Sequence, residues 1–203
     1  MMKGYKMTIL GEVKKILDKT LKAFSFKKEF VSPTYEYKRA EILRYAKEHD
    51  LKVFIETGTY KGETPAMLMN DFDELYTIEL SEELYKMATE RFARTKIKTH
   101  HGDSTKVLPE IIINIDKPIL FWLDGHYSNA PFCAKGTLET PIIEELLTIF
   151  NAKDFPHVIL IDDARCFGTE KDYPSIKELK KFICSHRPKA DIAVYEDIIR
   201  IKL

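Results

Sequence analysis

From Leu51 onward, short apolar runs alternate with stretches of helical periodicity, and this alternation constrains the fold more than any other feature of the sequence. Short apolar runs separated by helices are typical of βαβ units, in which helices cover a parallel sheet. The pattern predicts strands at 52–57, 74–79, 96–100, 119–124 and 157–162, and helices that begin near Thr64, Ser81, Thr105 and Thr140. It therefore predicts an α/β fold with a doubly wound, mostly parallel sheet.

The C-terminal residues depart from this alternation. After a helix predicted at 173–185, two more strands are expected at 190–195 and 198–202, joined by a tight turn at Glu196 and Asp197. A turn of two residues connects antiparallel strands. The sequence therefore predicts a seven-stranded sheet that ends in an antiparallel hairpin.

The N-terminal fifty residues predict helices only. Residues 8–30 carry apolar side chains at spacings of three and four between lysines, which predicts an amphipathic helix, and 35–49 predict a second helix after the break at Ser32-Pro33. We expect 1–50 to form an N-terminal helical cap on a single domain at 51–203. The lysine-rich face is expected to be solvated, with anionic lipid or a partner protein as the alternative contact.

The composition disfavours several classes of function. Lys and Arg together number 32, as do Asp and Glu, so the formal net charge is zero and gives no broad attraction for nucleic acid. No segment reaches the roughly 18 uninterrupted apolar residues of a membrane span. The N-terminal residues lack a signal-peptide core, and the three cysteines show no paired spacing. We therefore expect a cytoplasmic protein without a nucleic-acid partner.

Residues that form a site are expected where the predicted strands end, because ligands of doubly wound sheets bind beyond the carboxyl ends of the strands. The first strand leads into Glu56-Thr57-Gly58-Thr59-Tyr60-Lys61-Gly62, whose glycines permit a turn and a close approach of the backbone to a ligand. Glu79 ends the second strand about 20 residues after Gly58, where a carboxylate can accept hydrogen bonds from ribose. The alternatives are a glycine turn without a ligand and a helix-start role for Glu79.

Polar residues follow the third strand as well. Asp103 and Ser104 come directly before the helix expected at Thr105. These two side chains would either contact the edge of a base or cap that helix.

Three carboxylates follow the fourth and fifth strands. Asp124 ends the fourth strand, and Asp162 and Asp163 end the fifth. Because adjacent strands lie about 4.8 Å apart, we expect these carboxylates to converge. Such a group requires a hard divalent cation, a protein cation such as Arg165 or Lys135, or a raised pKa on one carboxyl. Of these, the sequence favours a metal ion.

In this order, these segments resemble the class I S-adenosylmethionine-dependent methyltransferases from about Lys52 to the C-terminus. The pattern Glu-x-Gly-x-x-x-Gly at 56–62 is typical of the first motif of that superfamily, whereas a dinucleotide dehydrogenase normally has Gly-x-Gly-x-x-Gly. The family also ends in an antiparallel hairpin. Asp-Gly-His at 124–126 and Asp-Asp at 162–163 are similar to the magnesium-dependent small-molecule O-methyltransferases.

The resemblance implies an enzyme that uses S-adenosylmethionine to methylate a hydroxyl group of a small-molecule acceptor. It implies that Glu56, Gly58, Thr59 and Gly62 shape the pocket for the methionine moiety, that Glu79 binds ribose, that Asp103 and Ser104 flank adenine, and that Asp124 lies beside the cofactor. It further implies Asp124, Asp162 and Asp163 as Mg²⁺ ligands and His126 as a general base. The chemistry of methyl transfer adds Lys135 as a second candidate base, and Asp124 as a candidate catalytic residue.

Three alternatives to this function remain open. They are an NAD-linked oxidoreductase, a binding module that has lost catalysis, and an enzyme that uses another metal on the same scaffold. The acceptor and the oligomeric state are not encoded in these motifs. The aromatic residues of the cap would either cover the site or bury a homodimer contact, and the connection at 127–140 would be either a lid or an ordered insertion.

Overall fold

The computed structural model describes residues 32–125 and 140–203, which lie in one compact unit that begins at Ser32. The helix predicted at 8–30 lies outside the described residues. So do His126, Lys135 and almost all of the connection at 127–140. Within the described ranges, no helix combines the length and the apolar character that a membrane crossing requires.

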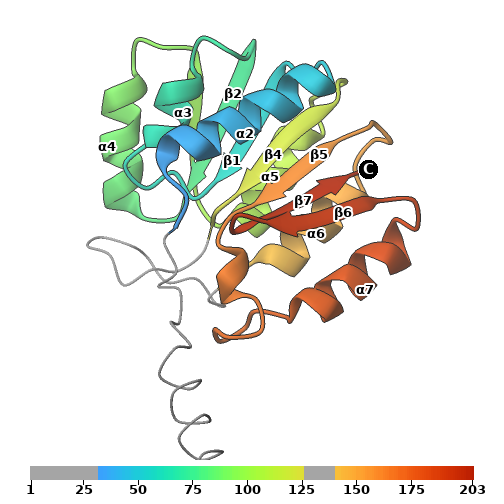
Figure 1. The fold of residues 1–203 in the computed structure, drawn as a ribbon. Helices are drawn as coiled ribbons and strands as arrows, with labels where there is room; N and C mark the ends of the chain where they lie inside the picture. The colour runs from blue at the N-terminus through green and yellow to red at the C-terminus, as the bar shows by residue number, and fades with distance from the viewer. Residues whose placement is uncertain (1–31, 126–139) are drawn as a thin grey trace, which may run out of the picture. The chain divides into compact units, whose positions relative to one another are not determined.

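A seven-stranded sheet with the order β3-β2-β1-β4-β5-β7-β6 organises this unit (Figure 1). Strands β1 to β5 are parallel, and β7 pairs in antiparallel fashion with both β5 and β6. The strands are β1 (Val53–Thr57), β2 (Glu74–Glu79), β3 (Ile97–His101), β4 (Ile119–Leu123), β5 (Val158–Ile161), β6 (Asp191–Tyr195) and β7 (Ile198–Lys202). The predicted mostly parallel sheet with a C-terminal antiparallel hairpin is confirmed.

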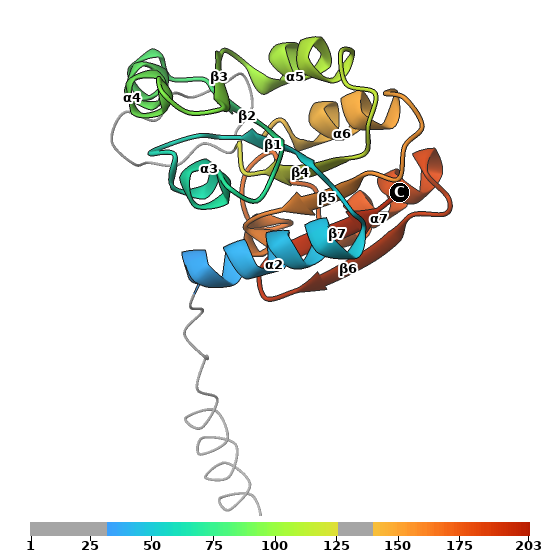
Figure 2. The ribbon, with the colours of Figure 1, turned by 90° about the horizontal axis from the view of Figure 1, so that it is seen from above.

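Helices cover both faces of the sheet, as the view in Figure 2 shows. One face carries α2 (Tyr35–Glu48), α3 (Glu63–Leu68) and α4 (Glu82–Phe92), and the other carries α5 (Ser104–Ile112), α6 (Ile142–Phe150) and α7 (Ile176–His186). A short 3-10 helix, η1 (Ala164–Cys166), follows β5. Because both faces are covered, β1 and β4 are buried along their whole length.

Alternation along β1 determines which face each side chain reaches. Val53 and Ile55 pack in the cluster beneath α5, α6 and α7, whereas Phe54 packs in the cluster beneath α2, α3 and α4. By the same alternation, Glu56 and Thr57 at the end of β1 point to opposite faces. The two residues therefore take part in different hydrogen-bonding networks beneath the site.

Helix α2 belongs to the same compact unit as the sheet. Ile42, Tyr45 and Ala46 are buried in one hydrophobic cluster with Phe54 and Trp122. The sequence places this helix in a cap at 1–50, but its packing makes it part of the sheet-containing unit. This packing matters for the site, because α2 brings one of its side chains to the carboxyl end of the sheet.

Two predicted helix starts shift for reasons of local chemistry. The helix expected from Tyr173 begins at Ile176, because Ser175 is its N-cap and forms a capping box with Glu178. The helix expected near Thr140 begins at Ile142, directly after Pro141. Pro141 is the N-cap of this helix, and its carbonyl accepts a hydrogen bond from the N–H of Glu145 at 3.0 Å.

Candidate functional site

The order of the strands reverses between β1 and β4, which are neighbours in the sheet although β2 and β3 separate them in sequence. In doubly wound folds, ligands bind in the crevice beyond the carboxyl ends of the strands at this point. The structure brings the described members of the predicted site to this edge, at or just after the ends of β1 to β5: Glu56, Gly58, Thr59, Gly62, Glu79, Asp103, Ser104, Asp124, Asp162 and Asp163.

Gly58 joins the loops that follow β1 and β4. Its φ is +86°, and an ideal Cβ at this position would lie 2.3 Å from the carbonyl oxygen of Asp124. On the neighbouring residues, the N–H of Asp124 donates to the carbonyl of Thr57 at 3.0 Å. Any side chain at 58 would therefore separate the two loops that form the centre of the crevice.

Gly62 allows the same loop to pack closely against α4. Its φ is +74°, and an ideal Cβ would lie 2.7 Å from the ring of Phe92 on α4. Gly62 is also the N-cap of α3, without a side-chain cap. Contact with α4 thus explains the second glycine of the motif without a ligand.

Glu79 orders the loop between β1 and α3. Its Oε2 accepts a hydrogen bond from the N–H of Tyr60 at 2.8 Å, and its Oε1 accepts one from the N–H of Ser81 at 2.8 Å. Burial raises the pKa of Glu79, and these backbone N–H groups act in the opposite direction. Each carboxylate oxygen has a second lone pair, so Glu79 can also accept a hydrogen bond from a ligand hydroxyl.

A buried network supports the loop from the α2–α4 face. The hydroxyl of Thr77 donates to Oε2 of Glu56 at 2.6 Å, and the hydroxyl of Thr59 lies 2.5 Å from that of Thr77. Burial raises the pKa of Glu56 well above its usual range, although the hydrogen bond from Thr77 opposes this effect. Glu56 and Thr59 therefore shape the loop from beneath.

Asp103 caps α5. Its Oδ1 accepts hydrogen bonds from the N–H of Thr105 at 3.0 Å and from the hydroxyl of Thr105 at 2.8 Å. Of the two roles that the sequence leaves open, the capping role is present in the structure. A role in binding adenine stays a prediction, because a capping carboxylate keeps further acceptor capacity.

Glu145 is a polar residue that the sequence did not single out. It lies on α6, is 1% exposed, and faces Gly125 after β4. Burial raises the pKa of Glu145 to about 7, and the hydroxyls of Ser104 and Thr57 act in the opposite direction. The sequence pattern could have indicated its burial, because Glu145 lies among the apolar positions of an amphipathic helix.

A small cavity lies between the ends of β4 and β5 on this side. Glu145 lines it together with Asp124, Gly125, Asp162 and Tyr173. Its volume of about 10 Å³ is enough for roughly one water molecule. The cavity connects the predicted cofactor loops to the acidic residues after β5.

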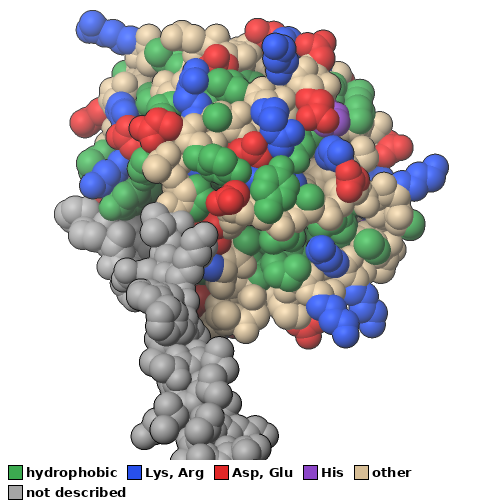
Figure 3. Space-filling model, in the orientation of Figure 1, with side chains coloured by type: hydrophobic (Ala, Val, Ile, Leu, Met, Phe, Trp, Pro, Cys, Tyr) green, Lys and Arg blue, Asp and Glu red, His purple; other side chains and the backbone are tan. Residues whose placement is uncertain are grey.

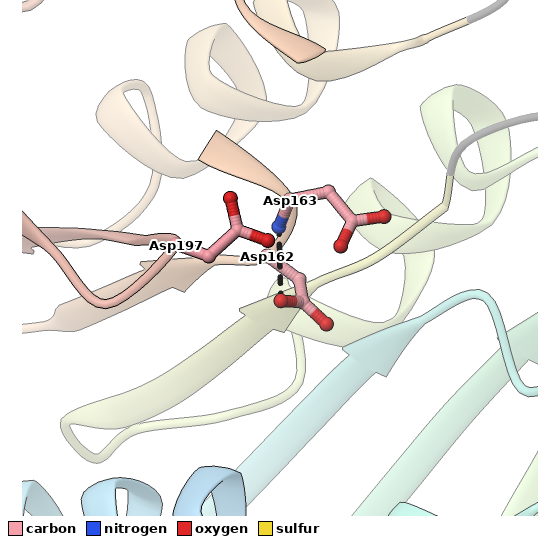
Figure 4. Close-up of side chains that lie close together, drawn as sticks. All are labelled: Asp162, Asp163 and Asp197. Atoms are coloured by element: carbon pink, nitrogen blue, oxygen red, sulfur yellow. Dashed lines mark hydrogen bonds between the residues drawn. The ribbon is translucent and has the colours of Figure 1, made fainter. Parts of the chain in front are cut away.

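Those acidic residues form a group whose composition differs from the prediction (Figure 4). Among the described residues, oxygens of Asp162, Asp163 and Asp197 all lie within 4.8 Å of one another. Asp197 comes from the β6–β7 turn, which reaches this edge because β7 pairs with β5. Its carbonyl accepts a hydrogen bond from the N–H of Ala164 at 2.8 Å. Asp197 is therefore a carboxylate of the group that the sequence does not predict, and the predicted Asp124 lines the same cavity as Asp162.

Cations of the chain bind every carboxylate of this group. Nη1 of Arg165 donates to Oδ1 of Asp163 at 2.6 Å and also to Oδ2 of Asp197. The ammonium of Lys38, on α2, donates to Oδ2 of Asp162. A hard divalent cation requires carboxylate oxygens that are open to it. The described carboxylates fit such an ion poorly, because it would have to displace Lys38 and Arg165 from oxygens of all three.

The pairing of Asp162 does not lower the pKa of its carboxyl. Burial raises the pKa of Asp162 to about 7, the charge of Asp124 adds to this effect, and Lys38 opposes it. Burial alone would lower the pKa of Lys38, but the carboxylates of Asp162, Asp124 and Asp163 raise it. The ammonium is therefore held in its charged form by acidic residues from two strand ends.

Lys38 was absent from the predicted site because its partner is 124 residues away in sequence. The one available signal was its place on α2, one turn before the buried Ile42 and two turns before the buried Tyr45. A lysine on the packed face of a helix must extend along that face to reach solvent or a carboxylate.

The sequence matches no protein-family model and shows no significant similarity to any curated protein. Solved structures do resemble it. The O-methyltransferase TomG from Streptomyces achromogenes, in complex with S-adenosylmethionine, is 18% identical over 90% of this chain and 84% of that chain, with a TM-score of 0.57. The O-methyltransferase from Bacillus cereus, in complex with S-adenosylhomocysteine, is 15% identical over 94% and 89% of the two chains, with a TM-score of 0.58.

A third similar structure is the methyltransferase PaMTH1 from Podospora anserina, bound to S-adenosylhomocysteine. It is 16% identical over 91% of this chain and 84% of that chain, with a TM-score of 0.57. Matches that cover nearly the whole described unit, at identities this low, establish the architecture. The chain has the Rossmann-like fold of the class I S-adenosylmethionine-dependent methyltransferases.

Proposed function

We propose that this protein is an S-adenosylmethionine-dependent methyltransferase that methylates a hydroxyl group of a small molecule. One observation carries the proposal. In a sheet with the methyltransferase fold, Gly58 packs against the backbone of Asp124 at the point where the strand order reverses, and Glu79 orders the adjoining loop. The crevice thus has the glycine loop, the carboxylate and the position that the cofactor needs.

In this proposal, the loop from Gly58 to Gly62 holds the methionine moiety, and Glu79 accepts a hydrogen bond from ribose. Asp103 and Ser104 flank adenine, and Asp124 lies beside the methionine end of the cofactor. Glu56 and Thr59 act from beneath by holding the loop in place.

Methyl transfer needs little chemical activation by the protein, because the methyl group of a sulfonium is already activated. The acceptor oxygen attacks the methyl carbon, the new C–O bond forms as the C–S bond breaks, and the hydroxyl proton passes to a base. The protein aligns the three atoms and accepts the proton. His126 and Lys135 are the bases that the sequence predicts, and both lie outside the described residues.

Assistance by Mg²⁺ finds no support in the described contacts. Such an ion would bind two neighbouring acceptor hydroxyls and lower their pKa values. Asp162 and Asp163, two of its three predicted ligands, already bind Lys38 and Arg165. The proposed methyl transfer therefore proceeds without a metal ion.

A small-molecule acceptor agrees with the surface better than nucleic acid does. Figure 3 shows acidic and basic side chains interspersed over the face that carries α2. Recognition of a phosphate backbone relies on clustered positive charge. The cytoplasmic location and the homodimer stay predictions.

The test is a calorimetric titration of the full chain with S-adenosylmethionine and, separately, with NAD. We expect saturable binding of S-adenosylmethionine alone. Glu79→Gln should weaken it by roughly 10- to 100-fold, because the carboxylate supplies charge-assisted hydrogen bonds. Glu74→Gln, at the other end of β2, is the matched control and should leave the affinity unchanged. Binding of NAD would indicate an oxidoreductase, and binding of neither would indicate a module without this activity.

A further inference from the structure

The carboxyl end of β5 holds more buried negative charge than the proposed methyl transfer uses. Asp162, Asp163 and Asp197 are 4%, 7% and 8% exposed. Their oxygens lie within 4.8 Å of one another. Carboxylates this close and this buried repel one another strongly, so the folded state must place cations beside them or keep one carboxyl protonated.

Two of these carboxylates share one cation. Arg165 binds both Asp163 and Asp197 through Nη1, and its backbone N–H donates to Oδ1 of Asp197 at 2.8 Å. All of these groups belong to η1 or to the turns beside it. The arginine thus completes a local unit that joins the end of β5 to the hairpin.

The third carboxylate, Asp162, takes its cation from the opposite end of the sequence. The Lys38 side chain is 16% exposed, and that of Asp162 is 1% exposed. The ammonium reaches Asp162 because Ile42 and Tyr45 fix α2 on the sheet. Asp162 also accepts a hydrogen bond from the N–H of Asp163 at 2.9 Å, so it is held from two sides.

We propose that the ammonium of Lys38 occupies the place of a divalent cation at this edge, so that the acceptor site contains a protein cation and binds no metal ion. An ammonium is a compact charge with three N–H donors, and within 32–125 and 140–203 Lys38 donates to Asp162. Its remaining donors suit an acceptor oxygen that loses its proton during methyl transfer. The role of these donors in methyl transfer rests on the proposed function, whereas the exclusion of a metal ion does not.

Binding of Mn²⁺ to the full chain, followed by electron paramagnetic resonance, tests the proposal. We expect no saturable binding to the wild type and one saturable site per chain in Lys38→Met, with at least a tenfold gain in affinity. Lys38→Arg keeps the charge and should behave as the wild type. Lys47→Met, on an exposed position of the same helix, is the matched control and should also behave as the wild type.

Two outcomes would overturn the proposal. One is a saturable Mn²⁺ site in the wild type that Asp162→Asn removes. The other is a folded Lys38→Met variant that binds no Mn²⁺. Removal of the ammonium would then open no metal site, so Lys38 would not occupy the place of a metal ion. If Lys38→Met does not fold, Lys38→Gln takes its place, and the melting temperature of this variant must rise with Mn²⁺.

The same samples separate this proposal from the proposed function. Titration of each variant with S-adenosylmethionine reports on the cofactor site, and the Mn²⁺ signal reports on the β5 edge. A wild type that binds neither ligand contradicts the methyltransferase proposal but leaves the exclusion of metal supported. A wild type that binds both contradicts only the role of Lys38.

Discussion

Arg200 on β7 donates two hydrogen bonds to Oε2 of Glu41 on α2, from Nε at 2.9 Å and from Nη2 at 2.8 Å. Arg200 is 1% exposed, and its Nη1 also donates to the carbonyls of Tyr195 and Ile198. The guanidinium therefore ties α2 to the hairpin in an environment with little water. Loss of Glu41 would leave this buried charge without its carboxylate partner, and the carbonyls that remain carry no full negative charge.

We therefore expect Glu41→Gln to lower the free energy of unfolding by about 3 kcal/mol or more. The matched variant is Arg44→Gln. Arg44 is another partner of Glu41, and its side chain is 44% exposed. This variant should lower the free energy of unfolding by less than about 1 kcal/mol. Urea denaturation measures both values. Equal losses in the two variants would show that burial of Arg200 does not determine the strength of the pair.

Glu145 should make the stability depend on pH. Burial raises the pKa of this carboxyl to about 7 in the folded protein, above its ordinary value of 4.5. Between these values the folded state binds more protons than the unfolded state, so the free energy of unfolding decreases as pH rises from about 4.5 to about 7. The change attributable to Glu145 is on the order of 3 kcal/mol.

Glu145→Gln removes this titration, so the variant should gain stability relative to the wild type as pH rises from 5 to 8. Urea denaturation at a series of pH values measures the difference. Glu144→Gln, at the exposed neighbouring position, should show no such trend. A difference between Glu145→Gln and wild type that is constant with pH would contradict the assignment.

Gly58 should be less tolerant of a side chain than another glycine with a similar backbone. Gly58 and Gly168 have φ values of +86° and +80°, but an ideal Cβ would lie 2.3 Å from its nearest atom at Gly58 and 3.3 Å at Gly168. Gly168→Ala should therefore cost about 1 to 3 kcal/mol from backbone strain alone. Gly58→Ala should cost more and also abolish binding of S-adenosylmethionine by calorimetry.

Equal costs for the two alanine variants, with cofactor binding retained in Gly58→Ala, would show that the loops after β1 and β4 separate without consequence. In that case the close approach of Gly58 to Asp124 is not a requirement of the cofactor site.

Variants of Asp103 separate its two roles. Asp103→Ala removes the cap of α5 and should cost about 1 kcal/mol. Asp103→Asn retains an acceptor for the N–H of Thr105 and should keep the melting temperature close to that of the wild type. If Asp103 also binds adenine, the asparagine variant should still bind S-adenosylmethionine more weakly. An unchanged affinity in a calorimetric titration would leave capping as its only role.

The fold was predictable because its elements have local signatures. Fully apolar runs such as 119–123 have the length of buried strands, and the turn at Glu196 and Asp197 has positive φ at both residues, as type I′ hairpin turns require. The start of α7 was predicted too early. The first residue of α7 depends on the capping box of Ser175 and Glu178, which hydrophobic periodicity does not detect.

The sequence predicted some residues of the candidate site and missed others. The rule that ligands bind at strand ends located Glu79 and Asp124 without any knowledge of their contacts. It did not locate Lys38 or Asp197, because the first comes from a helix on the face of the sheet and the second from the turn that leads into β7, a strand inserted out of sequence order. These residues are brought together by tertiary packing alone.

The insertion of β7 between β5 and β6 also affects how the protein is made. On the ribosome, β5 emerges before either strand of the hairpin, so its apolar edge, which β7 covers in the folded protein, stays open to pairing with other chains. Arg165 is then synthesised well before Asp197 can bind it. The acidic edge is therefore completed only when the hairpin docks.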